Sequence, residues 1–254
     1  MRFLIIIICL LSSLHICAQK NHRVLEVDHL GNSYTIDGNE LKKFSFDQEL
    51  VSNYSDPLLG EISSIDVSNP LRLLLFYKEF NQILYLDHTL SPISDPVDLY
   101  TYSDNDTQLC CDASSGGFWI FNKDDNQVFQ ISKQGEIINK SSLLSSFLKN
   151  GFPSKMTEYQ EKLYFLLPSK GLLILNKFGR FLQQIPIKGI TDFSFNNQDL
   201  LYLKDKIWFA YTPMVQTDSI VFKMDDSQEK QSKIWADKIY TFCGDQISIK
   251  KLKH

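Results

Sequence analysis

The chain has 254 residues, of which 43% are hydrophobic, 22% charged and 13% aromatic, a balance that is typical of a folded globular protein and excludes a disordered one. Its 26 Lys and Arg against 30 Asp and Glu give a net charge of −4, so it lacks the basic field that a nucleic-acid binder or a binder of anionic membranes normally carries. Only 11 Gly and 8 Pro exclude collagen-like and low-complexity architectures, whereas 18 Phe and 11 Tyr favour β-strands.

The N-terminal segment has the features of a secretory signal peptide. Arg2 is followed by an apolar run from Phe3 to Leu11, and smaller residues lead to Ala18. The run is well short of the roughly 20 residues that span a bilayer, which argues against a transmembrane anchor. We therefore predict a signal peptide at residues 1–18, removed by cleavage after Ala18, and a single domain at residues 19–254 in the periplasm or at the outer membrane.

Cysteine usage fits an exported protein that is not a disulfide scaffold. Cys9 and Cys17 lie in the predicted signal peptide, which leaves Cys110, Cys111 and Cys243. Adjacent residues of a strand point to opposite faces, so we favour Cys110 and Cys111 as small buried hydrophobic residues, with a bridge to Cys243 as the alternative. Lipidation of Cys17 is a further alternative that we do not favour, because the residues before it depart from the Leu-small-small pattern of such sites.

From residue 23 onward, short apolar alternations are separated by Asn, Asp, Gly, Ser and Pro, which predicts many short strands. The clearest unit has a strand at Phe118–Phe121, a turn at Lys123–Asn126, a strand at Val128–Ile131 and a turn at Gln134–Gly135, which is the pattern of a β-meander. Similar units recur as SYTIDGNELKKFSF, LRLLLFYKEFNQILYLD, KLYFLLPSKGLLILNKFGRFLQQIPI, LLYLKDKIWFAY and KIYTFCGDQISIKKL.

One more short strand precedes each unit, in the segments VLEVDHL, ISSIDVS, QLCCDAS, KMTEYQ, ITDFSFN and SKIWAD. The 236 residues expected after cleavage therefore divide into six blocks of about 39, close to the roughly 40–45 residues of a four-stranded propeller blade. We predict an all-β fold, a six-bladed β-propeller whose stacked blades bury a continuous ring of apolar side chains. A β-sandwich and an up-and-down barrel also have many short strands, but the block period argues against both.

Two details complete the predicted architecture. Lys140–Lys149 is the helical candidate, an insertion between the third and fourth blades with Ser141 as a possible N-cap. The last block ends after a strand at Gln246–Leu252 without an obvious fourth strand. We predict that an N-terminal strand around Arg23–Val27 closes the ring at that place.

The chain resembles a group of exported, uncharacterised β-propeller proteins of Bacteroidota in the segments LGNSYTIDGNELKKFSF, YSDPLLGEISSIDVSNPLRLLLFYKEFNQILYLDHTLSPI and KGLLILNKFGRFLQQIPIKGI. The likeness spans most of the chain after the predicted signal peptide. At greater distance the GNxY and ELKKF patterns are similar to NHL and YncE-like propellers. The resemblance implies the propeller fold and a periplasmic or envelope location, and it implies no reaction and no catalytic residue.

The sequence contains none of the motifs HExxH, CxxC, GxSxG, GxxxxGK[ST] and GxGxxG, so we expect no catalytic residue and no cofactor. The predicted fold nevertheless indicates one set of acidic residues that could lie close together. Asp28, Asp66, Asp112 and Asp237 lie at or near the ends of first strands of blocks, so they could gather at one mouth of a central channel and hold Ca²⁺. We favour the alternative that each carboxylate bonds its own turn, as Asp before a tight turn commonly does.

Exposed loops on a rigid scaffold are the best candidates for binding a partner. The loop candidates are Tyr54, Asp56, Pro57, Leu58, Asn69 and Pro213. We predict a non-enzymatic exported module that binds a protein or assembles with a protein complex of the cell envelope, such as outer-membrane biogenesis or secretion machinery. Nucleic acid is not expected as a partner, and peripheral membrane association stays open. The alternative is a small-ligand-binding or Ca-dependent propeller enzyme that acts at the channel mouth.

Overall fold

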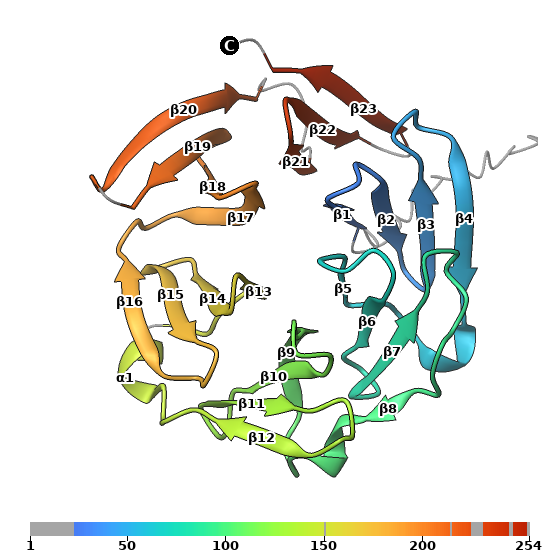
Figure 1. Ribbon diagram of the computed structural model, residues 1–254, viewed down its shortest axis with the longest axis vertical. Coiled ribbons are helices and arrows are strands. Elements are labelled where there is room, and N and C mark those ends of the chain that lie inside the picture. The colour runs from blue at the N-terminus through green and yellow to red at the C-terminus, as the bar shows by residue number, and fades with distance from the viewer. Residues whose placement is uncertain (1–22, 150, 214, 225–230, 244–245, 253–254) are drawn as a thin grey trace, which may run out of the picture.

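The computed structural model describes residues 23–149, 151–213, 215–224, 231–243 and 246–252, so the predicted signal peptide lies outside the described residues. These residues form six antiparallel sheets that stand as blades around one axis, which confirms the predicted six-bladed β-propeller (Figure 1). Within the described part of the chain the only α-helix has four residues, and no helix has the length and hydropathy needed to cross a membrane.

Each blade is built from consecutive strands, numbered outward from the axis. Blade 1 contains β1 (Arg23–Val27), β2 (Ser33–Asp37), β3 (Glu40–Phe44) and β4 (Leu50–Ser55); blade 2 contains β5 (Ser64–Asp66), β6 (Leu73–Tyr77), β7 (Gln82–Leu86) and β8 (Val97–Asp98); blade 3 contains β9 (Thr107–Asp112), β10 (Phe118–Asn122), β11 (Gln127–Ile131) and β12 (Ile137–Lys140). Blade 4 contains β13 (Lys155–Tyr159), β14 (Lys162–Leu167), β15 (Gly171–Asn176) and β16 (Phe181–Ile185); blade 5 contains β17 (Ile190–Asn196), β18 (Asp199–Lys204), β19 (Ile207–Thr212) and β20 (Thr217–Lys223); blade 6 contains β21 (Gln231–Trp235), β22 (Lys238–Cys243) and β23 (Gln246–Lys251). The helices among the described residues are α1 (Ser145–Leu148) and two short 3-10 helices at Pro57–Leu59 and Leu99–Thr101.

The inner strands β1, β5, β9, β13, β17 and β21 come from the six segments that the sequence singled out as preceding each unit. Because every blade repeats the same antiparallel order, these strands run in one direction and their C-terminal ends meet on one face of the ring. We call this face the mouth face; it carries the turns between first and second and between third and fourth strands. The opposite face, which we call the back face, carries the remaining turns and the connections between blades.

The predicted ring closure is wrong. Arg23–Val27 is the inner strand of blade 1, paired with β2 from Arg23↔Asp37 to Val27↔Ser33, and does not supply an outer strand to blade 6. Among the described residues blade 6 has three strands, and its inner strand β21 lies against β1. The first apolar alternation of the chain pairs with its sequence neighbour because a short connection makes the local hairpin the least costly pairing.

The predicted helical insertion is shorter than Lys140–Lys149. Helix α1 spans only Ser145–Leu148, whereas Lys140 is the last residue of β12. Ser141 does not cap the helix; its hydroxyl accepts a hydrogen bond from the backbone N–H of Val128 at 3.0 Å. The backbone groups that a longer helix would use are paired instead in the sheet or with this side chain. Tertiary structure therefore outweighs the weak helical preference of this segment.

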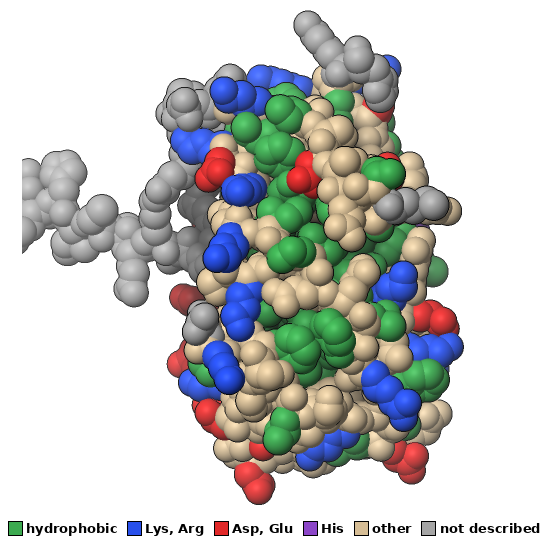
Figure 2. All heavy atoms as spheres, turned by 90° about the vertical axis from the view of Figure 1, so that its left-hand side faces the viewer, with side chains coloured by type: hydrophobic (Ala, Val, Ile, Leu, Met, Phe, Trp, Pro, Cys, Tyr) green, Lys and Arg blue, Asp and Glu red, His purple; other side chains and the backbone are tan. Residues whose placement is uncertain are grey.

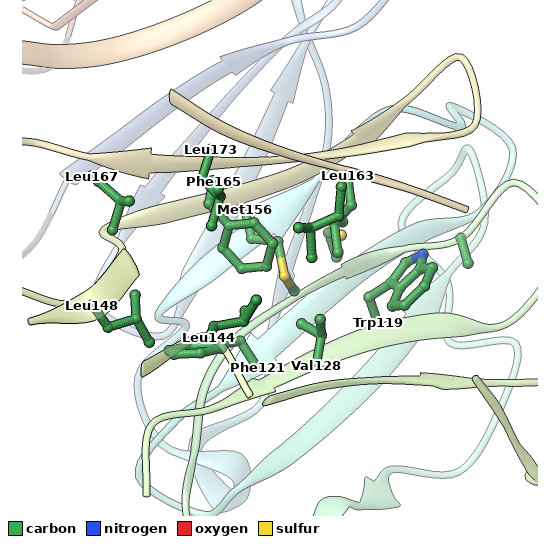
Figure 3. Packing of buried hydrophobic residues seen from close by; sticks show 13 residues of the cluster. Trp119, Phe121, Val128, Leu144, Leu148, Met156, Leu163, Phe165, Leu167 and Leu173 are labelled. Carbon is green, nitrogen blue, oxygen red and sulfur yellow. The ribbon is translucent and has the colours of Figure 1, made fainter. Parts of the chain in front are cut away.

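The core lies between neighbouring blades. One cluster joins blades 3 and 4, with Trp119 and Phe121 on β10 facing Leu163 and Phe165 on β14 (Figure 3). The rings of Phe121 and Phe165 meet edge to face with centroids 5.8 Å apart. The middle strands of a blade are covered by other blades on both faces of the sheet. Their sequences are therefore continuous apolar runs, such as Leu73–Tyr77.

The cysteines on β9 belong to this core. Cys110 and Cys111 are both buried and unbridged, as predicted, and burial raises the pKa of both thiols well above the usual value. The side chain of Cys243 lies outside the described residues. The two described thiols therefore act as small hydrophobic residues.

Candidate functional site

A pocket of about 410 Å³ opens on the mouth face between blades 2, 3 and 4. Its walls come from the turns that follow the inner strands β5, β9 and β13. It contains two residues that the sequence singled out, Asn69 and Asp112. It also contains Arg72 and Glu158, which sequence reasoning missed because neither belongs to a recognised motif.

The cation of this pocket is held by partners within the protein. The Nη2 atom of Arg72 lies 2.7 and 2.8 Å from the two carboxylate oxygens of Asp112. Its Nη1 atom donates to the carbonyl oxygen of Gly116. The guanidinium also lies 5.1 Å from the centre of the Tyr85 ring. Arg72 therefore fastens the turn after β9 to blade 2, and its charge is largely used by the protein itself.

The second acid of the pocket is equally engaged. Glu158 is buried and accepts a hydrogen bond from the indole Nε1 of Trp119 at 2.5 Å. Its other carboxylate oxygen accepts from the hydroxyl of Ser114 and, at 3.3 Å, from the backbone N–H of Ser114. Both oxygens face donors of blade 3, so this carboxylate ties blade 4 to blade 3 and is poorly placed to act on a ligand.

Two of the four acids expected at the mouth come together. The backbone N–H of Asp112 donates to the Oδ2 atom of Asp66 at 3.0 Å, so the two acids are neighbours. Burial raises the pKa of Asp112 to about 7; Asp66 adds to this shift, whereas Arg72 opposes it. Burial raises the pKa of Asp66 as well, against hydrogen bonds that lower it.

The other two acids stay within their own blades. Asp28 is buried and accepts hydrogen bonds from the backbone N–H groups of Leu30 and Asn32 and from the Tyr34 hydroxyl, each at 2.9 Å. Asp237 lies in the turn after β21 and pairs with Lys251 at 3.2 Å. Among the described residues no three His, Cys, Asp or Glu side chains are placed to hold one metal ion.

Four charged residues that sequence reasoning missed form a closed ring across the propeller axis. Each comes from an inner strand: Glu26 from β1, Lys155 from β13, Asp192 from β17 and Lys233 from β21. Lys233 lies 2.8 Å from Glu26 and 2.7 Å from Asp192, and Lys155 lies 3.3 Å from Glu26 and 2.8 Å from Asp192. In the sequence, the signal for this ring was a charged residue within each of these four short apolar alternations.

Within this ion ring, Lys155 and Asp192 stabilise the charged form of each other. Burial alone would raise the pKa of Asp192, but Lys155 and Lys233 outweigh it and hold that pKa at about 2. Burial alone would lower the pKa of Lys155, and Asp192 and Glu26 instead raise it. Lys155 and Asp192 are therefore charged near neutral pH. The ring joins blades 1, 4, 5 and 6 through the space around the axis.

The predicted loop residues do not share one surface. Tyr54, Asp56, Pro57 and Leu58 follow β4 on the back face, whereas Asn69 and Pro213 lie in turns of the mouth face. Pro57, Leu58, Asn69 and Pro213 are exposed, Asp56 is half-buried, and Tyr54 is half-buried against the core of blades 1 and 2. The sequence predicts that these loops are exposed, but the face that each one reaches depends on its place in the strand order.

Two of the back-face candidates, Pro57 and Leu58, belong to an apolar knob, which we define as Pro57, Leu58 and Phe80. The Asp56 side chain caps the 3-10 turn by accepting from the Leu58 N–H at 2.9 Å, and Leu58 is 86% exposed. Gly60 has a φ of +75°, and a Cβ there would lie 2.7 Å from the Phe80 ring, so the turn packs closely on Phe80. The knob is thus a fixed feature at the junction of blades 1 and 2.

No protein-family model and no curated protein matches the chain in sequence. Among solved structures it is similar to a catalytically inactive virginiamycin B lyase from Staphylococcus aureus, with 15% identity and a TM-score of 0.59 over 93% of this chain and 86% of that one. It is also similar to the extracellular domain of a hybrid two component system from B. thetaiotaomicron, with 14% identity and a TM-score of 0.55 over 92% of this chain and 36% of that one. A protein of unknown function from Bacteroides caccae has 12% identity and a TM-score of 0.54 over 83% and 82% of the two chains. At such identities the likeness shows the fold alone.

Proposed function

We propose that the protein is a non-enzymatic, exported module that binds a protein partner in the cell envelope, and that the apolar knob is its point of contact. The observation that carries this proposal is the exposure of Leu58 on a capped, tightly packed turn. A complex of outer-membrane biogenesis or secretion is the kind of partner expected. Similarity to an extracellular domain of B. thetaiotaomicron is compatible with this location.

The energetics of the knob favour binding. Full burial of an exposed Leu side chain contributes about 1.5–3 kcal/mol, and Phe80, on which the turn packs, offers aromatic surface as well. A turn that is already fixed by its cap and by contact with Phe80 loses little conformational entropy when a partner binds. The polar groups of the mouth pocket, by contrast, are largely occupied by partners inside the protein.

The test is crosslinking of a C-terminally tagged full-length chain in its native cell envelope, followed by affinity purification and mass spectrometry. We expect stoichiometric recovery of an envelope protein crosslinked near the knob. Leu58→Asp should reduce that recovery at least about tenfold. The matched control is Leu71→Asp, an equally drastic change at an exposed leucine of the mouth face, which should leave recovery unchanged. Recovery of the protein alone, or equal loss in both variants, would overturn the proposal.

Export rests on the sequence of residues 1–18, which lie outside the described residues. We propose that cleavage after Ala18 leaves Gln19 as the first residue of the mature protein. Intact-mass measurement of the protein from its native envelope checks this. A mass that corresponds to a lipidated Cys17 would contradict it and would favour the lipoprotein alternative.

The second candidate function is binding of a small ligand or Ca²⁺ at the mouth, and the pocket with its neighbouring Asp66 and Asp112 is the observation that favours it. Calorimetric titration with Ca²⁺ separates it from the first candidate. Heats that vanish in Asp66→Ala and Asp112→Ala would support a metal site. Absence of heat in the unchanged protein would remove it.

A further inference from the structure

Charge is distributed unevenly along this chain. Residues 137–188 carry eight Lys or Arg and only two Glu, a net charge of +6, although the whole chain has a net charge of −4. The remaining residues therefore carry −10. Residues 137–188 form the outer strand of blade 3 and all four strands of blade 4. Apart from Lys155, which belongs to the ion ring, their cations lie on one side of the propeller.

The same region exposes large apolar side chains on its outer strands. Ile137 and Ile138 of β12, Phe178 in the turn before β16, and Phe181 and Leu182 of β16 are each 46–51% exposed. Figure 2 views the molecule from this side and shows hydrophobic side chains in the middle of the face, with Lys and Arg and some Asp and Glu around them. We call this surface the basic rim and define it by Ile137, Ile138, Lys140, Phe178, Arg180 and Phe181.

Contacts between β12 and the turn before β16 join part of this surface across blades 3 and 4. Ile138, Lys177 and Phe178 line the same shallow pocket of about 320 Å³. Next to them, the side-chain amide of Asn139 reaches the carbonyl oxygen of Lys177 at 3.5 Å. The ring of Phe181 stacks on Phe147 of α1 with centroids 4.9 Å apart. A single flat ligand surface could therefore touch β12 and β16 together.

The cations of the rim keep their charge available to an outside partner, although the Lys140 amine lies 4.6 Å from the centre of the Phe129 ring. No ion pair joins Lys140 or Arg180 to a carboxylate in the described ranges, and both side chains are exposed. Lys177 lies 3.0 Å from Glu161, but both side chains are about half exposed or more, and such pairs are weak. The rim therefore offers positive charge beside half-exposed aromatic and branched side chains.

This composition fits a lipid surface better than a protein surface. Seven of the eight cations in residues 137–188 are Lys, which is depleted at protein interfaces, where Arg is enriched. A lysine can lay its apolar stem along a hydrophobic surface and keep its amine among phosphates. Aromatic and branched side chains can enter the boundary between headgroups and acyl chains, which needs no pocket of matching shape to receive them.

We propose that the basic rim docks the protein on the surface of an anionic phospholipid bilayer. The negative charge of the other residues does not oppose this, because it repels the membrane from the remaining sides and leaves one orientation favoured. A net charge of −4 therefore does not exclude membrane contact when the cations are gathered on one side. The proposal is separate from the apolar knob, which lies at blades 1 and 2, so either can fail alone.

The test is sedimentation of the purified protein, without its signal peptide, with vesicles of phosphatidylcholine alone and of phosphatidylcholine mixed with phosphatidylglycerol. We expect binding to the mixed vesicles only, weakened by added salt. Each cation near an anionic surface changes the partition coefficient about fivefold, so Lys140→Glu with Arg180→Glu should lower it at least about 25-fold. Phe181→Ser should weaken binding further while the salt dependence persists.

The matched control is Lys78→Glu with Lys250→Glu, which makes the same change in net charge at exposed lysines of blades 2 and 6. This control should bind the mixed vesicles nearly as well as the unchanged protein. Equal loss in both double variants would show a net-charge effect and overturn the rim. Failure of the unchanged protein to bind mixed vesicles at low salt would overturn the proposal too, and would favour an acidic protein as the occupant of this surface. Circular dichroism confirms that each variant is folded.

Discussion

The ion ring gives the sharpest test of how this propeller is held closed. Lys233 contacts Glu26 on one side and Asp192 on the other, and its side chain is only 6% exposed. In Lys233→Met the apolar stem is kept and the charge is removed. Two carboxylates then share the single remaining cation, Lys155.

The expected cost follows from the geometry and from the pKa of Asp192. Removal of one partner from a buried ion pair costs about 3–5 kcal/mol, and the partial exposure of Glu26 and Asp192 with the retained Lys155 reduces this to about 2–3 kcal/mol. The lowered pKa of Asp192 has the direction that this stabilisation requires, because Lys155 and Lys233 together outweigh the effect of burial. In a domain of this size that loss lowers the melting temperature by about 5–10 °C.

The effect also has a defined pH dependence. A carboxylate with a lowered pKa in the folded state contributes stability that is complete above its unfolded pKa of 3.8 and is lost as the pH falls towards about 2. In Lys233→Met, burial is less well opposed, so the pKa of Asp192 should rise. The gap in stability between the two proteins should therefore be largest at pH 7 and should shrink as the pH is lowered towards 3.

Urea unfolding followed by fluorescence at pH 7, 5 and 3 measures this gap, because the pKa of Asp192 falls from 3.8 to about 2 on folding. Lys251→Met is the matched control, since it removes the same charge from an exposed pair with Asp237 and should leave the midpoint unchanged. The double variant Lys233→Met with Asp192→Asn should be less destabilised than the two single changes added together. A loss below about 0.5 kcal/mol for Lys233→Met, or a gap independent of pH, would refute the role assigned to the ring.

Three further predictions concern the blades and the mouth. Gly171→Ala should cost at least about 3 kcal/mol in urea unfolding, because a Cβ there would lie 1.9 Å from the carbonyl oxygen of Ile185 at a φ of +98°. The control Gly116→Ala has a φ of +101° and no atom nearer than 3.8 Å to the added Cβ, so it should cost only about 1–2 kcal/mol. Equal costs would contradict the steric argument. Because burial raises the pKa of Asp112 from 3.8 to about 7, its contribution to stability should fall as the pH rises from about 4 through 7; Asp112→Asn should flatten the change in urea midpoint between pH 5 and 8, and an unchanged slope would count against the shift. Cys110 and Cys111 should resist iodoacetamide in the native protein and react in urea, as mass spectrometry can show; rapid labelling of the folded protein would contradict their burial.

Much of the fold was readable because a strand is a local pattern. The meander over residues 118–131 follows from alternating apolar residues and from the turn at Lys123–Asn126, and the structure pairs Phe118 with Ile131 as that pattern requires. The six inner strands were found in the same way. Their spacing, close to one blade length, then led from strands to a six-bladed ring.

The candidate sites were only partly readable. Asp66 and Asp112 were expected on one face and are neighbours there, whereas Asp28 and Asp237 bond nearby groups. The exposed loops were recognised, but Leu58 and Asn69 reach opposite faces, which depends on how many strands separate them. The excess of cations in residues 137–188 is visible in the sequence, and a net charge taken over the whole chain conceals it.

By itself, therefore, the sequence determined the strand content, the six blocks and the exposure of the loops, because these depend on residues close together in the chain. Only the tertiary structure decided the ion ring, the engagement of Arg72 and Glu158, and the meeting of Ile138 and Phe178 on one surface. Glu26 and Lys233 are 207 residues apart in the chain. Their contact exists because six similar blades close into a ring, and no local pattern records which inner-strand side chains then meet across the axis.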